Sequence, residues 1–165
     1  MLKFSAALVC AALSLSGQNL SGRRAPSFSL PDTHMRQHDI LDARGHWLLV
    51  DFMKTDCPHC QELSKKLEAL KNRTGGRVEI FSIVMPPDNF QTVNTYAYIN
   101  KVTSPILFDQ GQVALAYFKG TGAQLNFDTP HLFAVDPNGT IVRDWGMGGV
   151  EAPGFLSELE QLLKK

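Results

Sequence analysis

The pattern of apolar and polar positions predicts strands that alternate with helices. Residues 46–53, HWLLVDFM, form a nearly continuous apolar run, which is typical of a strand buried on both faces of a sheet. Further segments with strand character follow at 78–84, 106–108, 132–135 and 141–145. The sequence Asp-Pro-Asn-Gly joins the last two of these segments and predicts a hairpin turn.

Three other segments have the spacing of helices. The first begins at Pro58, carries Glu62 and Lys66 one turn apart, and ends at the pair Gly75-Gly76. The second covers residues 90–101, and a leucine-rich stripe after Pro153 predicts a closing helix. The order of elements therefore predicts an α/β fold in which helices cover both faces of a central sheet.

Composition sets the class of protein. A chain of 165 residues with 44% hydrophobic and 19% charged content suits one compact domain with a full core. The formal net charge is zero, and no basic run is interleaved with aromatic residues. We therefore expect no nucleic-acid partner.

The N-terminus has the layout of a secretory signal peptide. Lys3 precedes an apolar segment at 4–15, which is shorter than the roughly 20 residues of a membrane-spanning helix. We predict a signal peptide at 1–16, cleavage near Gly17, a loose tether at 17–24 and one domain at 25–165. A buried N-terminal helix is one alternative, and a lipid anchor at Cys10 is another, although Val9 is bulky for a lipobox. The expected location is periplasmic or otherwise exported.

Removal of the signal would leave only Cys57 and Cys60, in the motif DCPHC. A disulfide across so short a loop constrains the unfolded chain little, which argues against a structural staple. A structural zinc site needs four ligands, and the five histidines show no matching second pair. The spacing therefore favours redox exchange, with no metal and no bound cofactor.

The position of the two cysteines predicts their roles. They lie where the buried strand gives way to the first helix, and Cys60 shares a helical stripe with Leu63 and Leu67. Cys60 should therefore face inward, whereas Cys57 should lie at the helix N-terminus, whose unpaired N–H groups and dipole favour a thiolate. We predict Cys57 as the nucleophile and Cys60 as the resolving thiol.

At this point the chain resembles the thioredoxin-like proteins, and within them the exported TlpA/ResA-type redoxins related to the AhpC/TSA peroxiredoxins. The resemblance covers nearly all of the expected mature chain. It rests on APSFSLPD at 25–32, LLVDFMKTDCPHC at 48–60, SPILFDQGQVALAYF at 104–118 and TPHLFAVDPNGTIVRDWGMGG at 129–149. These segments are similar to the family's N-terminal hairpin, active-site strand, central insertion and cis-proline strand with its hairpin.

The resemblance implies a thioredoxin-like fold with a central mixed sheet, and a thiol-disulfide oxidoreductase that acts on protein thiols. A membrane or exported redox partner would recycle it, and the protein would be a monomer. The resemblance also implies that Thr129-Pro130 is the cis-proline dipeptide that contacts an extended substrate chain. His131, which follows, could approach the site, but a packed side chain is the favoured interpretation.

Asp51 matches the thioredoxin aspartate that takes the proton of the resolving thiol. A carboxylate in an apolar strand is costly unless it is neutral, paired or useful, and a raised pKa would suit this proton transfer. The alternative is a strand-end aspartate bonded to backbone or solvent.

Several positions depart from the family pattern. Met85-Pro86-Pro87 occupies the region where exported reductases carry a glutamate, with Asp88 as the nearest acid, and Asp56 replaces the usual tryptophan. The long segment 118–129 is a possible specificity element. These departures weaken a strict assignment to cytochrome c maturation.

The dipeptide Pro58-His59 is that of the oxidant DsbA. A protonated His59 and the helix end favour the Cys57 thiolate, while Asp56 and Asp51 oppose it, so the expected potential lies between those of thioredoxin and DsbA.

A TlpA-like reductase is the favoured function, and three alternatives remain open. The first is a DsbA-like thiol oxidase. The second is a copper-binding chaperone, although related chaperones space their cysteines one residue further apart. The third is a peroxidase, although Lys54 and Val50 stand where peroxiredoxins carry Thr or Ser and Pro.

Overall fold

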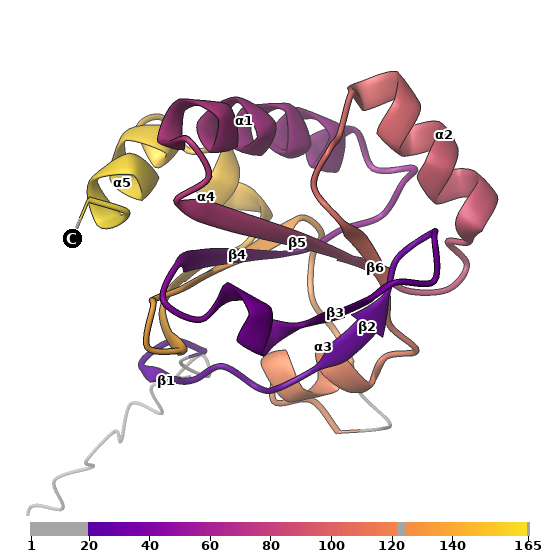
Figure 1. Cartoon of the computed structure of the whole chain (residues 1–165), viewed down its shortest axis with the longest axis horizontal. Coiled ribbons are helices and arrows are strands. Elements are labelled where there is room, and N and C mark those ends of the chain that lie inside the picture. The colour runs from indigo at the N-terminus through magenta and orange to yellow at the C-terminus, as the bar shows by residue number, and fades with distance from the viewer. Residues whose placement is uncertain (1–19, 122–124, 165) are drawn as a thin grey trace, which may run out of the picture.

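A six-stranded mixed sheet forms the centre of the computed structural model, which describes residues 20–121 and 125–164 (Figure 1). Its strands lie in the order β1 (Arg23–Arg24), β8 (Thr140–Trp145), β7 (His131–Val135), β4 (Trp47–Phe52), β5 (Val78–Val84) and β6 (Ile106–Phe108). Strands β4, β5 and β6 are parallel, whereas β7 runs antiparallel to β4 and β8 antiparallel to β7. The predicted α/β fold with a mixed sheet is confirmed.

The central position of β4 in the sheet explains its apolar sequence. It pairs with β5 on one side and with β7 on the other, so that Asp51 lies between Ser82 and Leu132. Every residue of β4 after Trp47 is buried. Neighbouring strands on both edges and packed layers on both faces leave no exposed position. The apolar residues of the strand are therefore nearly continuous and do not alternate with polar ones.

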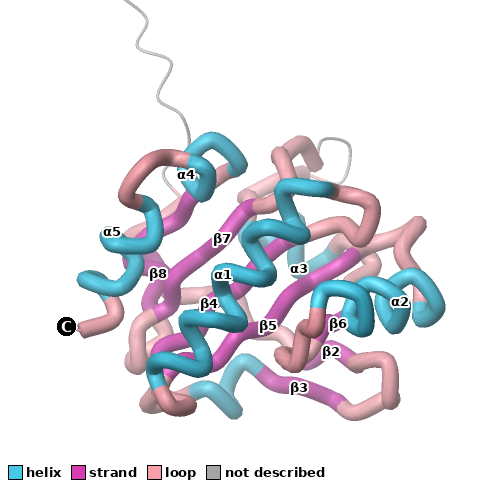
Figure 2. Tube along the Cα trace, turned by 90° about the horizontal axis from the view of Figure 1, so that it is seen from above, coloured by secondary structure: helices cyan, strands magenta, loops and turns pink. Residues whose placement is uncertain are grey.

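Helices and a hairpin cover the two faces of this sheet. The helices α1 (Pro58–Thr74), α2 (Phe90–Asn100), α4 (Met147–Glu151) and α5 (Phe155–Leu162) lie on one face (Figures 1 and 2). The other face carries α3 (Gln112–Tyr117), the hairpin of β2 (Ser29–Pro31) and β3 (Gln37–Asp39), and the 3₁₀ helix η1 (Ile40–Ala43). The predicted N-terminal hairpin and central insertion are both present.

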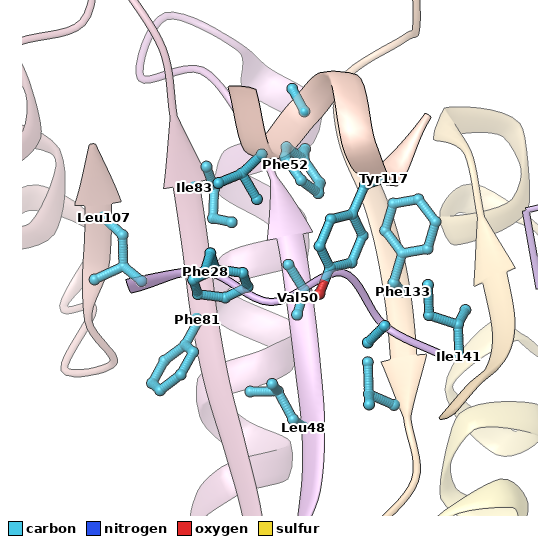
Figure 3. Packing of buried hydrophobic residues seen from close by; sticks show 14 of the residues in the cluster. Phe28, Leu48, Val50, Phe52, Phe81, Ile83, Leu107, Tyr117, Phe133 and Ile141 are labelled. Carbon is cyan, nitrogen blue, oxygen red and sulfur yellow. The ribbon is translucent and has the colours of Figure 1, made fainter. Parts of the chain in front are cut away.

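The alternation of side chains along β4 divides the core into layers. Leu48, Val50 and Phe52 point toward Phe28 and Tyr117 on the hairpin and α3 side (Figure 3). Leu49 packs with Leu63 and Leu67 of α1 on the opposite side. Asp51 and Leu49 share this side of the strand because side chains two residues apart point the same way. The carboxyl group is thereby placed beneath the helix that carries the cysteines.

The structure also differs from the sequence prediction in places. Arg23 and Arg24, predicted as part of a loose tether, pair with β8 as an edge strand, so the ordered domain begins before Ala25. Helices α3 and α4 were not predicted, because one has six residues and the other contains Gly148-Gly149. The closing helix begins at Phe155 rather than at Pro153. The predicted signal segment lies outside the described residues.

Candidate active site

Cys57 is the N-cap residue of α1, and Pro58 occupies the first turn of the helix. Its Sγ accepts a hydrogen bond from the backbone N–H of Cys60 at 3.2 Å. The thiol in turn donates to the carbonyl oxygen of Thr129, with 3.7 Å between the two atoms. An N–H donor and the N-terminal end of a long helix therefore face this half-buried sulfur.

Cys60 lies one turn into α1 and is completely buried. It packs in an apolar cluster with Met53, Val84 and Tyr96, away from solvent. Burial raises the pKa of the Cys60 thiol, and its hydrogen bond with Cys57 raises that pKa further. Both cysteines are free thiols, so this geometry is that of the reduced protein. The inward placement of Cys60 that the leucine stripe predicted is confirmed.

Asp51 is the buried acid of the site, with no exposed surface. Neither carboxyl oxygen has a hydrogen-bond partner within the described residues, so the alternative of a strand-end aspartate bonded to backbone does not hold. Burial raises the pKa of the Asp51 carboxyl from 3.8 to about 7. The negative charge of Asp51 also contributes to the raised pKa of Cys60.

The segment before β7 closes the other side of the site. The peptide bond between Thr129 and Pro130 is cis, as the resemblance implied, and Pro130 is buried. A second cis bond joins Pro86 and Pro87, which the sequence did not reveal. The carbonyl of Thr129 points at the Cys57 thiol, so the residue that precedes the proline forms part of the wall around the nucleophile.

Asp88 holds the loop that leads into the redox motif. Its Oδ2 accepts from the backbone N–H of Thr55 at 3.1 Å, and its Oδ1 accepts from the hydroxyls of Thr55 and Thr92. Asp88, the acid nearest to the position of the family glutamate, therefore binds the loop that precedes Cys57. No local pattern predicts this contact, because it joins residues 33 positions apart.

The two ionisable residues nearest Cys57 in the sequence, Asp56 and His59, are exposed. The Nδ1 atom of His59 forms an ion pair with Oε1 of Glu151 from α4. Glu151 was not a candidate in the sequence, since its approach depends on how α4 folds back over the sheet. Pro58 is also exposed, so the dipeptide between the cysteines lies at the surface.

His131 is packed, as the favoured interpretation had it. Its side chain is 12% exposed, its Nε2 lies 3.0 Å from Oδ2 of Asp144, and its ring contacts Phe118 and Phe133. Burial opposes ionisation of Asp144, but hydrogen bonds from His131 and Ser21 lower the pKa of this carboxyl. His131 therefore supports β7 and β8 rather than reaching the cysteines.

A cavity of about 580 Å³ adjoins the cis-proline segment. Phe118 and Phe127 stack there with ring centroids 3.9 Å apart, and Asp128 and His131 also line the cavity. A larger cavity of about 730 Å³ lies between the β2 segment and α3, beside the start of α2. The smaller one is more relevant to the redox pair, because the residues on either side of Thr129-Pro130 form part of its wall. The possible specificity loop contributes to it, and residues 122–124 of that loop lie outside the described residues.

Fold, cysteine pair and cis-proline segment define a protein of the thioredoxin-like class. Within residues 20–121 and 125–164, no three His, Cys, Asp or Glu side chains are grouped to hold a metal ion. The chain belongs to the AhpC/TSA family, whose model matches residues 21–144.

Individual relatives agree with this assignment. The chain is 30% identical over 126 residues to the thiol-disulfide oxidoreductase ResA of Geobacillus thermodenitrificans, an alignment that covers 74% of this chain and 67% of the relative. It is 25% identical over 145 residues to the thioredoxin-like protein YneN of Bacillus subtilis, over 86% of this chain and 78% of the relative. A candidate DsbE-type thiol:disulfide interchange protein from Chlorobium tepidum has a similar fold, with a TM-score of 0.71, 20% identity, and coverage of 87% and 95% of the two chains. The resemblance to TlpA/ResA-type redoxins is thereby confirmed.

Proposed function

We propose that this chain is an exported thiol-disulfide oxidoreductase in which Cys57 forms a mixed disulfide with a protein substrate and Cys60 resolves it. The observation that carries the proposal is the contrast between the two thiols. Cys57 is half-buried at a helix N-terminus and accepts an N–H hydrogen bond, whereas Cys60 is fully buried behind it. In a pair of this kind, the accessible sulfur attacks the substrate and the buried sulfur later resolves the mixed disulfide.

In the reductive direction, the Cys57 thiolate attacks one sulfur of a substrate disulfide. A mixed disulfide forms, and the other substrate sulfur leaves as a thiolate that takes a proton from solvent. Cys60 then loses its proton to the Asp51 carboxylate, and its thiolate attacks Sγ of Cys57. The Cys57–Cys60 disulfide forms, the second substrate sulfur leaves as a thiolate that takes a proton from solvent, and Asp51 holds the proton that came from Cys60. Two electrons have then moved from the enzyme to the substrate.

Asp51 suits the role of proton acceptor in the second step. With a pKa of about 7, the carboxyl is partly ionised at neutral pH and can take up a proton without prohibitive cost. The acid lies in the buried layer that also contains Cys60, where solvent cannot easily perform this transfer. We assign it as the base for Cys60 rather than for Cys57, which is open to water.

The substrate chain would pass along Thr129-Pro130. Proline has no N–H to donate, and an extended peptide placed beside the cis bond would bring its cysteine to Sγ of Cys57. The adjoining cavity with the stacked rings of Phe118 and Phe127 could take a side chain near the substrate cysteine. An exported or membrane-bound redox partner would recycle the enzyme at the same surface.

The TlpA/ResA-type resemblance supports the reductive direction. A thiol oxidase is the second candidate, because Pro58-His59 is the dipeptide of DsbA. Both directions use the same residues and differ in the redox potential of the pair, which decides whether the disulfide or the dithiol is the stable form in a given compartment.

Limited alkylation of the reduced protein tests the assigned roles of the two cysteines. We expect iodoacetamide to modify Cys57 at least ten times faster than Cys60, since only the thiolate reacts and Cys60 is both buried and held as a thiol by a raised pKa. Peptide mapping by mass spectrometry after brief labelling gives the ratio. Equal labelling, or faster labelling of Cys60, would contradict the assignment.

Export predicts a processed N-terminus. We expect the exported protein to begin near Gly17 and to lack Cys10, because the apolar segment has the length of a signal rather than of a membrane span. Intact mass of protein recovered from outside the cytoplasm checks this. A mature chain that still carries Met1 would remove the processing claim and leave the redox assignment standing.

A further inference from the structure

His59, the ionisable side chain between the two cysteines, is contacted by a residue from a distant part of the chain. Its Nδ1 forms an ion pair with Oε1 of Glu151, the last residue of α4. Helix α4 is fixed against β7 and β8, and its Val150 is buried, so Glu151 approaches from a supported position. Both side chains are about half exposed, at 51% for His59 and 46% for Glu151.

The other charges near His59 do not compete for this contact. Glu62, one turn further along α1, pairs with Lys65 at 2.7 Å. Asp56 is exposed, and no hydrogen bond or ion pair joins its side chain to His59 among the contacts of the described residues. Glu151 is therefore the carboxylate that balances the imidazolium when His59 is protonated.

We propose that Glu151 is a positioning residue that sets the redox potential of the Cys57–Cys60 pair by holding His59 and balancing its charge. This inference rests on the proposed function. A free imidazolium beside Cys57 would stabilise the thiolate, and hence the reduced form, which makes the disulfide more oxidising. The carboxylate of Glu151 offsets part of that positive charge when the two side chains are paired. Glu151 thus moderates the oxidising influence of Pro58-His59 in this chain.

Equilibration with glutathione measures the effect directly, through the reaction of the protein disulfide with two glutathione thiols to give the protein dithiol and glutathione disulfide. The assay is run at about pH 6, toward the acid side of the range in which histidine side chains change charge. Glu151→Gln keeps an oxygen that can accept from Nδ1–H but removes the charge. We expect it to raise the equilibrium constant for reduction about two- to fivefold, a size typical of exposed charge pairs, and the shift should shrink at about 1 M salt.

Two further variants assign the cause. Glu160→Gln is the matched control, because Glu160 forms a partly exposed pair with Arg73 at the other end of α1. It should leave the constant unchanged. In a His59→Ala background, Glu151→Gln should shift the constant by clearly less than it does alone, because the carboxylate acts through the imidazole.

The glutathione measurements distinguish failure of the proposed role of Glu151 from failure of the proposed function. An unchanged constant in Glu151→Gln, a shift toward a more reducing pair, or an equal shift with and without His59 would each overturn the role of Glu151. Failure of Cys57 and Cys60 to form any disulfide with glutathione in the wild-type protein would instead refute the proposed function. A shift in the oxidising direction that depends on His59 supports the inference.

Discussion

Replacing Cys57 with alanine is expected to lower the rate of disulfide exchange with a protein substrate by about a thousandfold or more, because the attacking sulfur is lost and residues 20–121 and 125–164 expose no other thiol in its place. Cys60, the remaining thiol of the pair, is completely buried and has a raised pKa. The rate is measured from the reduction of a model protein disulfide in the presence of excess dithiol. Circular dichroism of the same preparation shows whether the fold is intact.

Cys60→Ala provides the matched comparison. It also stops turnover, but it should retain the first chemical step, so that one equivalent of substrate thiol appears in a rapid burst. Cys57→Ala should show no burst. Substantial burst activity in Cys57→Ala would mean that Cys60 can attack on its own, and the assigned order of events would be wrong.

Replacing Asp51 with asparagine is expected to stabilise the protein at alkaline pH. The folded-state pKa of Asp51 is raised from 3.8 to about 7, so the folded chain keeps a proton that the unfolded chain has already lost. The stability that this proton supports is fully present below about pH 4 and is lost as pH rises through the folded-state pKa. At about 1.4 kcal/mol per pKa unit, the loss at pH 8 is on the order of 4 kcal/mol.

Asparagine carries no charge at any of these pH values, so it avoids that loss. We expect Asp51→Asn to unfold like the wild type near pH 4 and to be more stable by several kcal/mol near pH 8, as measured by urea unfolding across this range. Asp56→Asn is the control, because Asp56 is an exposed carboxylate in the same loop. It should leave the pH dependence unchanged. A wild-type stability that does not fall between pH 5 and pH 8 would show that Asp51 is not buried as an acid.

The same substitution should slow the resolving step by about a hundredfold, since asparagine cannot accept the Cys60 proton. Release of the second substrate thiol after the initial burst reports this step. If Asp51→Asn gains stability at pH 8 but keeps its resolving rate, Asp51 is buried as an acid but does not accept the Cys60 proton.

Much of the site could be predicted because it depends on local patterns. The apolar run of β4, the leucine stripe of α1 and the motif DCPHC between them determined which cysteine is inside. The buried Asp51 was visible as a lone acid in an apolar strand. These features follow from periodicity along a single element, which the sequence displays directly.

The contacts that complete the site come from pairings across the fold, and no local pattern predicted them. Asp88 binds Thr55, and Glu151 reaches His59 from a helix that the sequence did not reveal because Gly148 and Gly149 weaken its pattern. Each contact depends on the path of a loop after a strand. Such paths are set by tertiary packing, so only the assembled structure brings these side chains together.

The most direct test of the central claim is to trap the intermediate. Cys60→Ala, expressed in cells that export it, should accumulate disulfide-linked complexes with its substrates and with its recycling partner. Mass spectrometry of those complexes should place every intermolecular bond at Cys57, and reduction should release the partners. Cys57→Ala should trap nothing. Complexes linked through another residue, or the absence of any complex with Cys60→Ala in spite of normal folding and export, would contradict a mechanism that proceeds through a Cys57 mixed disulfide.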